Sequence, residues 1–256
     1  MNWVYRIFIM FLISPLVIEA QCKHHRVLIG PEVYYMTRSR DGGTEQTGTL
    51  YGFSFLYERV RHCGLYWGLE GRYAVGTLKG HDGNDQDIKS RKRDSDLEGS
   101  LGFTYQFSKA GKCLSLTPIV GGGYFWGKND FVDPSPLTVN YRGQFSYYLL
   151  GILATLYWND QISVGLRYKV KRMLEGECRV SGIPESDDLK QVMENENQYE
   201  VELPIQIRRV EGRFWQWLIT PFYRSRHYGK RENFPRDFFD TRFKMYGVKG
   251  SIEVNF

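Results

Sequence analysis

The run 81–87, His-Asp-Gly-Asn-Asp-Gln-Asp, is the segment whose residue types and spacing come nearest to a ligand site. Its carboxylates Asp82, Asp85 and Asp87 follow one another closely beside a glycine, and such groups can bind calcium. The run lacks the closing glutamate and the spacing of an EF-hand loop. We therefore expect a solvated loop tip there and no metal site.

A second set of charged residues recurs at every other position of segments that are otherwise apolar. In the segment 65–78, for example, Glu70 and Arg72 alternate with Leu69 and Tyr73. A period of two predicts β-strands with one polar and one apolar face. The charges on the polar faces are Glu58, Glu70, Arg72, Glu98, Arg167, Lys169, Lys171, Glu200, Glu202, Arg208, Lys249 and Glu253. Together they would fill the interior of a barrel with ion pairs or line a pore.

Ten segments show this alternation and are expected to position the charges as strands. They are 27–36, 50–59, 65–78, 97–107, 113–126, 145–158, 162–171, 199–208, 214–225 and 246–256. The segment 145–158 is apolar on both faces, so eight or twelve strands remain alternatives to ten. Long polar stretches at 79–95, 127–142, 174–197 and 227–240 are expected to be loops on one side, opposite short turns, as in outer-membrane barrels.

The N-terminus and the aromatic residues favour a barrel with a lipid-facing exterior over a soluble barrel. Residues 1–20 combine Arg6, an apolar core and a final Ala20, which indicates a secretory signal peptide before a barrel at 21–256. Trp67, Trp158 and Trp215 lie near short turns, where an interfacial aromatic girdle would be. The polar faces are therefore expected to point into the lumen.

The last segment, 246–256, ends on Phe256 behind an alternating apolar row. It resembles the closing strand of bacterial outer-membrane β-barrels, in which this segment is the signal read by the barrel-insertion machinery. The residues that carry the resemblance are Tyr246, Val248, Ile252, Val254 and Phe256. The mature chain is similar to small barrels of the OmpA/OmpX type, enlarged by a hairpin. The resemblance implies an all-β, antiparallel, up-and-down transmembrane β-barrel in the bacterial outer membrane, with periplasmic termini.

The expected function is a structural or surface-interaction role, without catalysis and without a cofactor. The long loops, above all 174–197, are the expected contact surface for a host or envelope protein. Outer-membrane lipid, through its phosphates, is the expected acidic partner of a chain with a net charge of +5. The export signal and the lack of a basic block argue against nucleic acid. A small pore is the alternative function.

A barrel enzyme is a further alternative. Ten strands resemble the omptin surface proteases, and the resemblance implies that acidic and Asp–His pairs would lie at the outer mouth. The nearest candidates are Asp82, Asp85 and His227, but no acid flanks His227 in the sequence. No Ser–His pair for a lipid hydrolase stands out either.

The lumen charges are expected to pair. A barrel of about ten strands is close to the size at which side chains fill the lumen. Because an unpaired buried charge is costly, pairs across strands are expected. They are Glu70 or Glu98 with Arg72, and Arg167 or Lys169 with Glu200 or Glu202.

The cysteines are expected to reach an oxidising compartment, where disulfides persist. Cys22 precedes the first expected strand and Cys63 follows the second, so a Cys22–Cys63 disulfide would join neighbouring ends of a hairpin. The alternative is that neither pairs. Cys113 and Cys178 are expected to be free or to form links to other envelope proteins.

Overall fold

The computed structural model describes residues 24–60, 63–109, 112–136, 139–158, 161–182, 188–207, 215–233 and 238–255. The described residues form twelve strands in one sheet. In chain order they are β1 (His24–Arg40), β2 (Thr44–Val60), β3 (Gly64–His81), β4 (Asp87–Lys109), β5 (Lys112–Val132), β6 (Asn140–Tyr157), β7 (Ile162–Ser181), β8 (Leu189–Val192), β9 (Asn197–Glu202), β10 (Ile205–Ile207), β11 (Trp215–Tyr228) and β12 (Thr241–Asn255). None of the described residues belongs to a helix long and apolar enough to cross a membrane.

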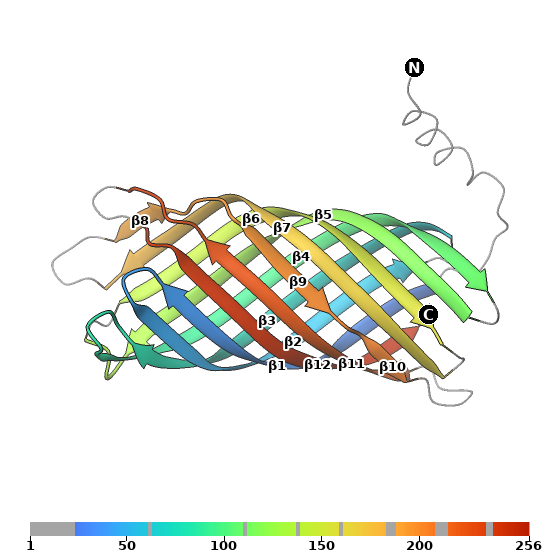
Figure 1. Cartoon of the computed structure of the whole chain (residues 1–256), viewed down its shortest axis with the longest axis horizontal. Coiled ribbons are helices and arrows are strands. Elements are labelled where there is room, and N and C mark those ends of the chain that lie inside the picture. Colours follow the sequence, from blue (N-terminus) through green and yellow to red (C-terminus); the bar gives the residue numbers. More distant parts are fainter. Residues whose placement is uncertain are drawn as a thin grey trace, which may run out of the picture.

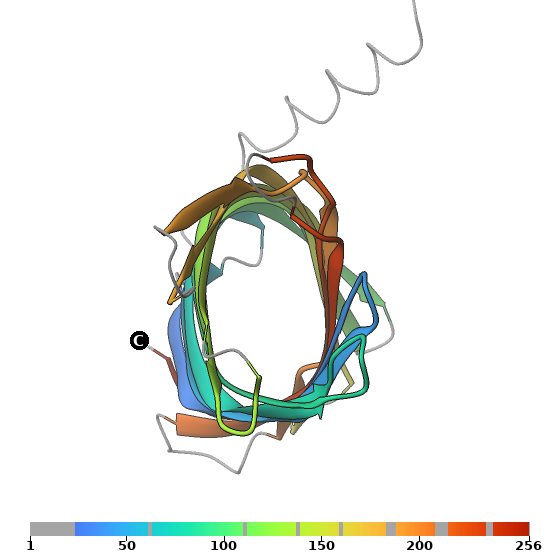
Figure 2. The same ribbon diagram turned by 90° about the vertical axis from the view of Figure 1, so that its left-hand side faces the viewer.

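The sheet closes into a barrel because β1 pairs with both β2 and β12, and every pairing is antiparallel (Figures 1 and 2). Three short strands, β8, β9 and β10, together occupy a single strand position of the barrel, between β7 and β11. β9 and β10 pair with both of those neighbours, whereas β8 pairs with β7. The barrel therefore has ten strand positions, and the predicted antiparallel up-and-down barrel of ten strands is confirmed.

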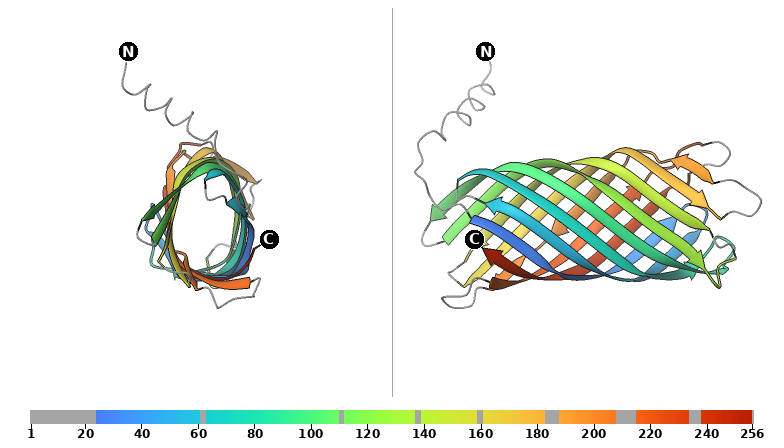
Figure 3. Two further views of the ribbon diagram at one scale, coloured as in Figure 1. Left: turned by 90° about the vertical axis from the view of Figure 1, so that its right-hand side faces the viewer. Right: turned by 180° about the vertical axis from the view of Figure 1, so that it is seen from behind.

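Most of the expected long loops are wrong, because the strands continue through them. The stretch expected as a loop at 79–95 consists largely of the ends of β3 and β4, joined by residues 82–86. In the same way, β5 and β6 continue to Val132 and from Asn140, and β7 continues to Ser181. These tilted hairpins extend one end of the barrel (Figure 3). The first residues of β1 and the last residues of β12 lie at the other end. The outward side chains of the hairpins are largely charged, such as Lys79 and Arg93, and the inward ones mix apolar residues such as Ile88 with charged ones such as Lys92. Hydropathy therefore loses its period of two although the backbone ladder continues.

The structure decides which face of each strand is buried. Apolar residues at alternate positions point outward and are exposed, among them Phe53, Leu101, Val120 and Leu150. Polar and charged side chains at the positions between them are buried inside the barrel. This is the reverse of a soluble barrel, and it is the arrangement of a barrel surrounded by lipid.

Several predicted features lie outside the described residues: the signal peptide 1–20, Cys22, Arg208 and Phe256. Cys63 is exposed beyond the end of β2 and has no disulfide partner among the described residues. In β1, His24 is the Cα partner of Val60 in β2, so the two strand ends that would carry a Cys22–Cys63 link are neighbours. The disulfide itself stays a prediction.

Candidate functional site

The interior of the barrel holds a network of ion pairs. Every predicted lumen charge among the described residues points inward from its strand. The cations of the network are Arg26, Arg72, Lys92, Arg167, Lys169, Lys171, Arg224, Arg226 and Lys249. The acids, equal in number, are Glu32, Glu58, Glu70, Asp94, Asp96, Glu98, Glu200, Glu202 and Glu253. Among the described residues the network is thus formally neutral.

Bridging lysines connect the carboxylates of different strands. The Lys169 Nζ lies 2.8 Å from Glu70 Oε2 and 2.5 Å from Glu98 Oε1. The Lys171 Nζ lies 2.6 Å from Glu98 Oε2 and 3.0 Å from Glu200 Oε2. Since each acid is shared between cations, removing one member leaves its partners under-compensated in a buried site.

The expected partners were only partly right, because most pairs cross the lumen instead of joining adjacent strands. Arg72 lies 4.0 Å from Glu70, but its close partners are Asp96 and Glu200, the latter at 2.6 Å. Lys169 is the Cα partner of Glu200 in the ladder, yet its ammonium bridges β3 and β4. A curved wall points its inward side chains toward the barrel axis, and their charged ends meet there.

The sequence interpretation missed several members of the network. The expected loop at 79–95 and the expected strand start at 97 leave Asp94 and Asp96 out of the predicted lumen charges. The even-numbered residues of β11 point inward, and Arg224 and Arg226 are two of them. Arg224 already lies on the polar face of the expected segment 214–225, and extending the alternation by one residue would have found Arg226.

The carboxylates of Glu70, Glu200 and Glu202 converge closely enough to hold a metal ion. Lys249 lies 3.2 Å from Glu70 and 2.5 Å from Glu202, and Arg72 and Lys171 contact Glu200. These cations occupy the coordination directions that a metal would need, so the cluster is part of the ion-pair network.

An aromatic layer spans the lumen outside the ion-pair network. Ring centroids of Phe125 and Phe145 are 4.8 Å apart, those of Phe145 and Tyr228 are 5.6 Å apart, and those of Tyr228 and Phe243 are 5.2 Å apart. These residues come from β5, β6, β11 and β12, so the layer reaches across the barrel. The Arg226 guanidinium lies 3.8 Å from the Phe125 ring centroid and connects the layer to the ions beneath it.

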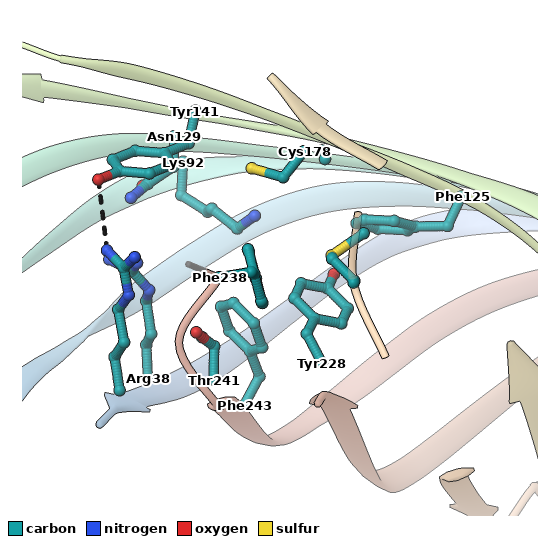
Figure 4. Close-up of a pocket in the computed structure, with 14 residues that line it drawn as sticks. Arg38, Lys92, Phe125, Asn129, Tyr141, Cys178, Tyr228, Phe238, Thr241 and Phe243 are labelled. Carbon is teal, nitrogen blue, oxygen red and sulfur yellow. Dashed lines mark hydrogen bonds between the residues drawn. The ribbon is translucent and has the colours of Figure 1, made fainter. Parts of the chain in front are cut away.

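A pocket lies on the outer side of the aromatic layer, at the mouth of the barrel (Figure 4). Its floor includes Phe125, Tyr228 and Phe243, and its walls carry the cations Arg38 and Lys92. The figure shows these cations pointing toward the space beside the rings. The mouth pocket therefore combines aromatic surface with positive charge.

Solved structures share this architecture at low sequence identity. The outer membrane protease OmpT from Escherichia coli matches with a TM-score of 0.54 and 8% identity, over 93% of this chain and 99% of that chain. The chain has the fold of a bacterial outer-membrane β-barrel. The translocator domain of the autotransporter NalP from Neisseria meningitidis gives a TM-score of 0.48 and 9% identity, over 99% of this chain and 95% of that chain. The sequence matches no described protein family and no curated protein.

The closing strand of this outer-membrane barrel is β12. Its predicted signal residues point outward: Tyr246 is 54% exposed, and Val248 and Val254 are each 38% exposed. Ile252 lies on the same face. β12 pairs with β1 and β11 and so completes the barrel. The fold shared with bacterial outer-membrane barrels supports the expected localisation in the outer membrane. Recognition of the strand by the insertion machinery stays a prediction.

The residues considered for a protease do not come together. Asp82 accepts hydrogen bonds from the backbone N–H groups of Asn84 and Gln86 and so closes the β3–β4 turn. His227 instead forms a 2.6 Å hydrogen bond with Asp240. This pair is brought together by the β11–β12 hairpin, lies on the outward side of β11, and borders none of the described cavities.

Proposed function

We propose that this protein is a non-conducting, non-enzymatic outer-membrane barrel whose outer hairpins form a contact surface for other molecules. The observation that carries the proposal is the filled lumen. Glu58, Glu98 and Glu202 are at most 2% exposed, and the aromatic layer lies across the barrel beyond them. Water-filled channels are typical of wider barrels, whereas side chains fill barrels of about eight strands.

The ion-pair network supports a closed barrel over the pore alternative. A conducting lumen needs solvated charges that ions can approach and leave. Here the charged ends of Lys169, Lys171 and Lys249 each contact two or more carboxylates. Such contacts bind the side chains to one another, and the aromatic layer lies across the lumen beyond them.

The test is single-channel recording in planar lipid bilayers. The purified protein should give no steady conductance steps, because the ion pairs and the rings occlude the lumen. The control is heat-modifiable migration of the same preparation on a gel, which identifies folded barrel. Uniform, long-lived steps from a heat-modifiable preparation would contradict the proposal and favour the pore.

The outward face supports lipid phosphates as one partner. Arg93, Lys128, Arg142 and Arg179 are successive Cα partners across β4, β5, β6 and β7. The row begins directly beyond Trp126, which is 46% exposed at the edge of the apolar belt. Like charges on facing strand positions repel, so a row of four is stabilised by an external anion. In the proposed membrane orientation this is the level at which we expect phosphates of the outer leaflet.

A groove beside the row adds space for a head group. It has a volume of about 350 Å³ and includes Arg91 and Arg93 in its lining. Within the described residues neither arginine has an ion-pair partner, whereas Lys128 lies 2.9 Å from Asp130. Arg179 of the row lies 2.6 Å from Glu177, and the groove lining also includes Asp130 and Asp133. Arg93 of the row and Arg91 beside it are therefore the unpaired cations of the groove that an incoming phosphate would neutralise.

Vesicles of different composition test the lipid partner. Phosphatidic acid, compared with phosphatidylcholine alone, should raise the temperature at which the folded band converts to the unfolded band. The double variant Arg91→Gln with Arg93→Gln should lose most of this rise, because it removes the unpaired cations. Lys79→Gln, which alters an exposed cation of β3, is the control. An equal rise in all three proteins would contradict the assignment.

The outer hairpins are the proposed surface for a host or envelope protein. β3 with β4, and β5 with β6, continue as paired strands to their connections at 82–86 and 133–139. Because their backbone groups are hydrogen-bonded in a ladder, they present a pre-organised surface and lose less entropy on binding than flexible loops do.

A further inference from the structure

The mouth pocket has features that neither the closed lumen nor a surface role requires. It is a cavity of about 50 Å³, which exceeds the space that a single water needs. Its lining brings together Arg38 and Arg40 of β1, Lys92 of β4, Asn129 of β5 and Gly143 of β6. The pocket draws on strands from opposite sides of the barrel.

The pocket carries positive charge that no described acid neutralises. Lys92 lies 2.7 Å from Asp94, but Arg38 and Arg40 have no ion-pair partner among the described residues. Arg38 is 6% exposed and donates a hydrogen bond to the amide oxygen of Gln46. Arg40 donates a 3.3 Å hydrogen bond to the Tyr141 hydroxyl. Arg40 is half-buried beside the buried Arg38. Two neighbouring guanidinium groups withdrawn from solvent without a carboxylate are costly, and a bound anion would remove that cost.

An orphaned amide points to the same conclusion independently. Asn129 is 6% exposed, lines the pocket, and makes no hydrogen bond with either its amide nitrogen or its amide oxygen within the described structure. Buried amides in proteins normally have partners. The Nε of Arg40 is likewise buried without a partner. The pocket thus offers unused donors as well as charge.

The other residues that line the pocket indicate which further chemical group would fit beside the two arginines. Tyr228, Phe238 and Phe243 supply ring surfaces, and Cys178 is buried opposite Gly143 in the ladder. A Cβ added to Gly143 would meet no atom within 4 Å, so the space beside this glycine is open. An aromatic or other flat apolar group would fit against the rings with its charged end toward Arg38 and Arg40.

We propose that the mouth pocket binds a small organic oxyanion. Its carboxylate or phosphate group is held by Arg38 and Arg40, its remaining oxygen accepts from the Asn129 amide, and its ring packs on Phe238 and Phe243. Arginine suits this role because its planar donors match the geometry of oxyanions. The ligand enters from the outside and stops at the aromatic layer.

Isothermal titration of the folded barrel in detergent tests the site with phenyl phosphate as the probe. Phenyl phosphate should bind, benzyl alcohol should not, and inorganic phosphate should bind more weakly than phenyl phosphate because it lacks the ring. The double variant Arg38→Met with Arg40→Met should weaken binding by about tenfold or more, since each charged hydrogen bond is lost. Gly143→Leu should weaken it by occupying the open space while leaving both arginines in place.

Lys79→Met with Lys244→Met is the matched control, because it removes as many exposed cations from the outward face without altering the pocket. Its affinity for phenyl phosphate should equal that of the unaltered protein. The proposal is overturned if the Arg38 and Arg40 variant binds as tightly as this control while both migrate as folded barrels. It is also overturned if inorganic phosphate binds as tightly as phenyl phosphate, or if Gly143→Leu has no effect.

Discussion

Lys169→Met should destabilise the folded barrel by about 3 kcal/mol or more, because it removes a cation shared by two buried carboxylates. Lys169 is 4% exposed and contacts Glu70 and Glu98. Glu70 would keep Lys249 at 3.2 Å and Glu98 would keep Lys171 at 2.6 Å, but the lumen would hold one excess negative charge. Methionine preserves the length of the side chain, so the loss reflects the charge and its hydrogen bonds.

Urea unfolding in lipid vesicles, followed by tryptophan fluorescence, measures the effect. Lys79→Met is the matched control because Lys79 lies on the exposed face of β3 and has no ion-pair partner among the described residues, so it should change stability little. A second variant, Lys169→Met with Glu98→Gln, should recover part of the loss by removing the excess charge. Equal stability of Lys169→Met and Lys79→Met would show that the ion-pair network does not hold the barrel together.

Val248→Arg should destabilise the barrel by about 2–4 kcal/mol, the cost of a cation on the lipid face at mid-depth. Val248 is 38% exposed in β12, and its Cα partners are Val33 in β1 and Pro221 in β11. Val254→Arg should cost less, because Val254 lies near the end of the strand, where arginine reaches the interface.

The same unfolding assay compares these variants with Val248→Leu, which keeps the position apolar and should unfold like the unaltered protein. Heat-modifiable migration shows which variants assemble. If Val248→Arg and Val248→Leu were equally stable, the outward face of β12 would not contact hydrocarbon.

Adjacent residues of β12 point to opposite faces, so a substitution at Val248 tests the lipid face and one at Lys249 tests the lumen. Lys249, the next residue, points inward and contacts Glu70 and Glu202. A shift of one residue in the pairing of β12 would place this lysine in lipid and Val248 among charges. The contrast between the faces therefore fixes the register of β12 against β1 and β11.

The sequence by itself determined the strands, their two faces and the charges that would share one of those faces. These features depend on the local alternation of side chains along an extended backbone, which is visible in any single segment. The same rule failed where hairpins carry charged residues on both faces, as in 87–96 of β4, because hydropathy there no longer reports the pleat.

The alternation alone did not decide which face meets lipid, although the N-terminal segment and the aromatic residues favoured the apolar one. The tertiary structure decided this and also which charges meet one another. A period of two is symmetric, so Leu69 and Glu70 could exchange inside and outside until the barrel closed. Closure also brings Arg72 of β3 to Glu200 of β9, and His227 to Asp240, pairs for which sequence spacing gives no signal. The mouth pocket arises in the same way, because residues from both sides of the barrel line it only after β12 has paired with β1.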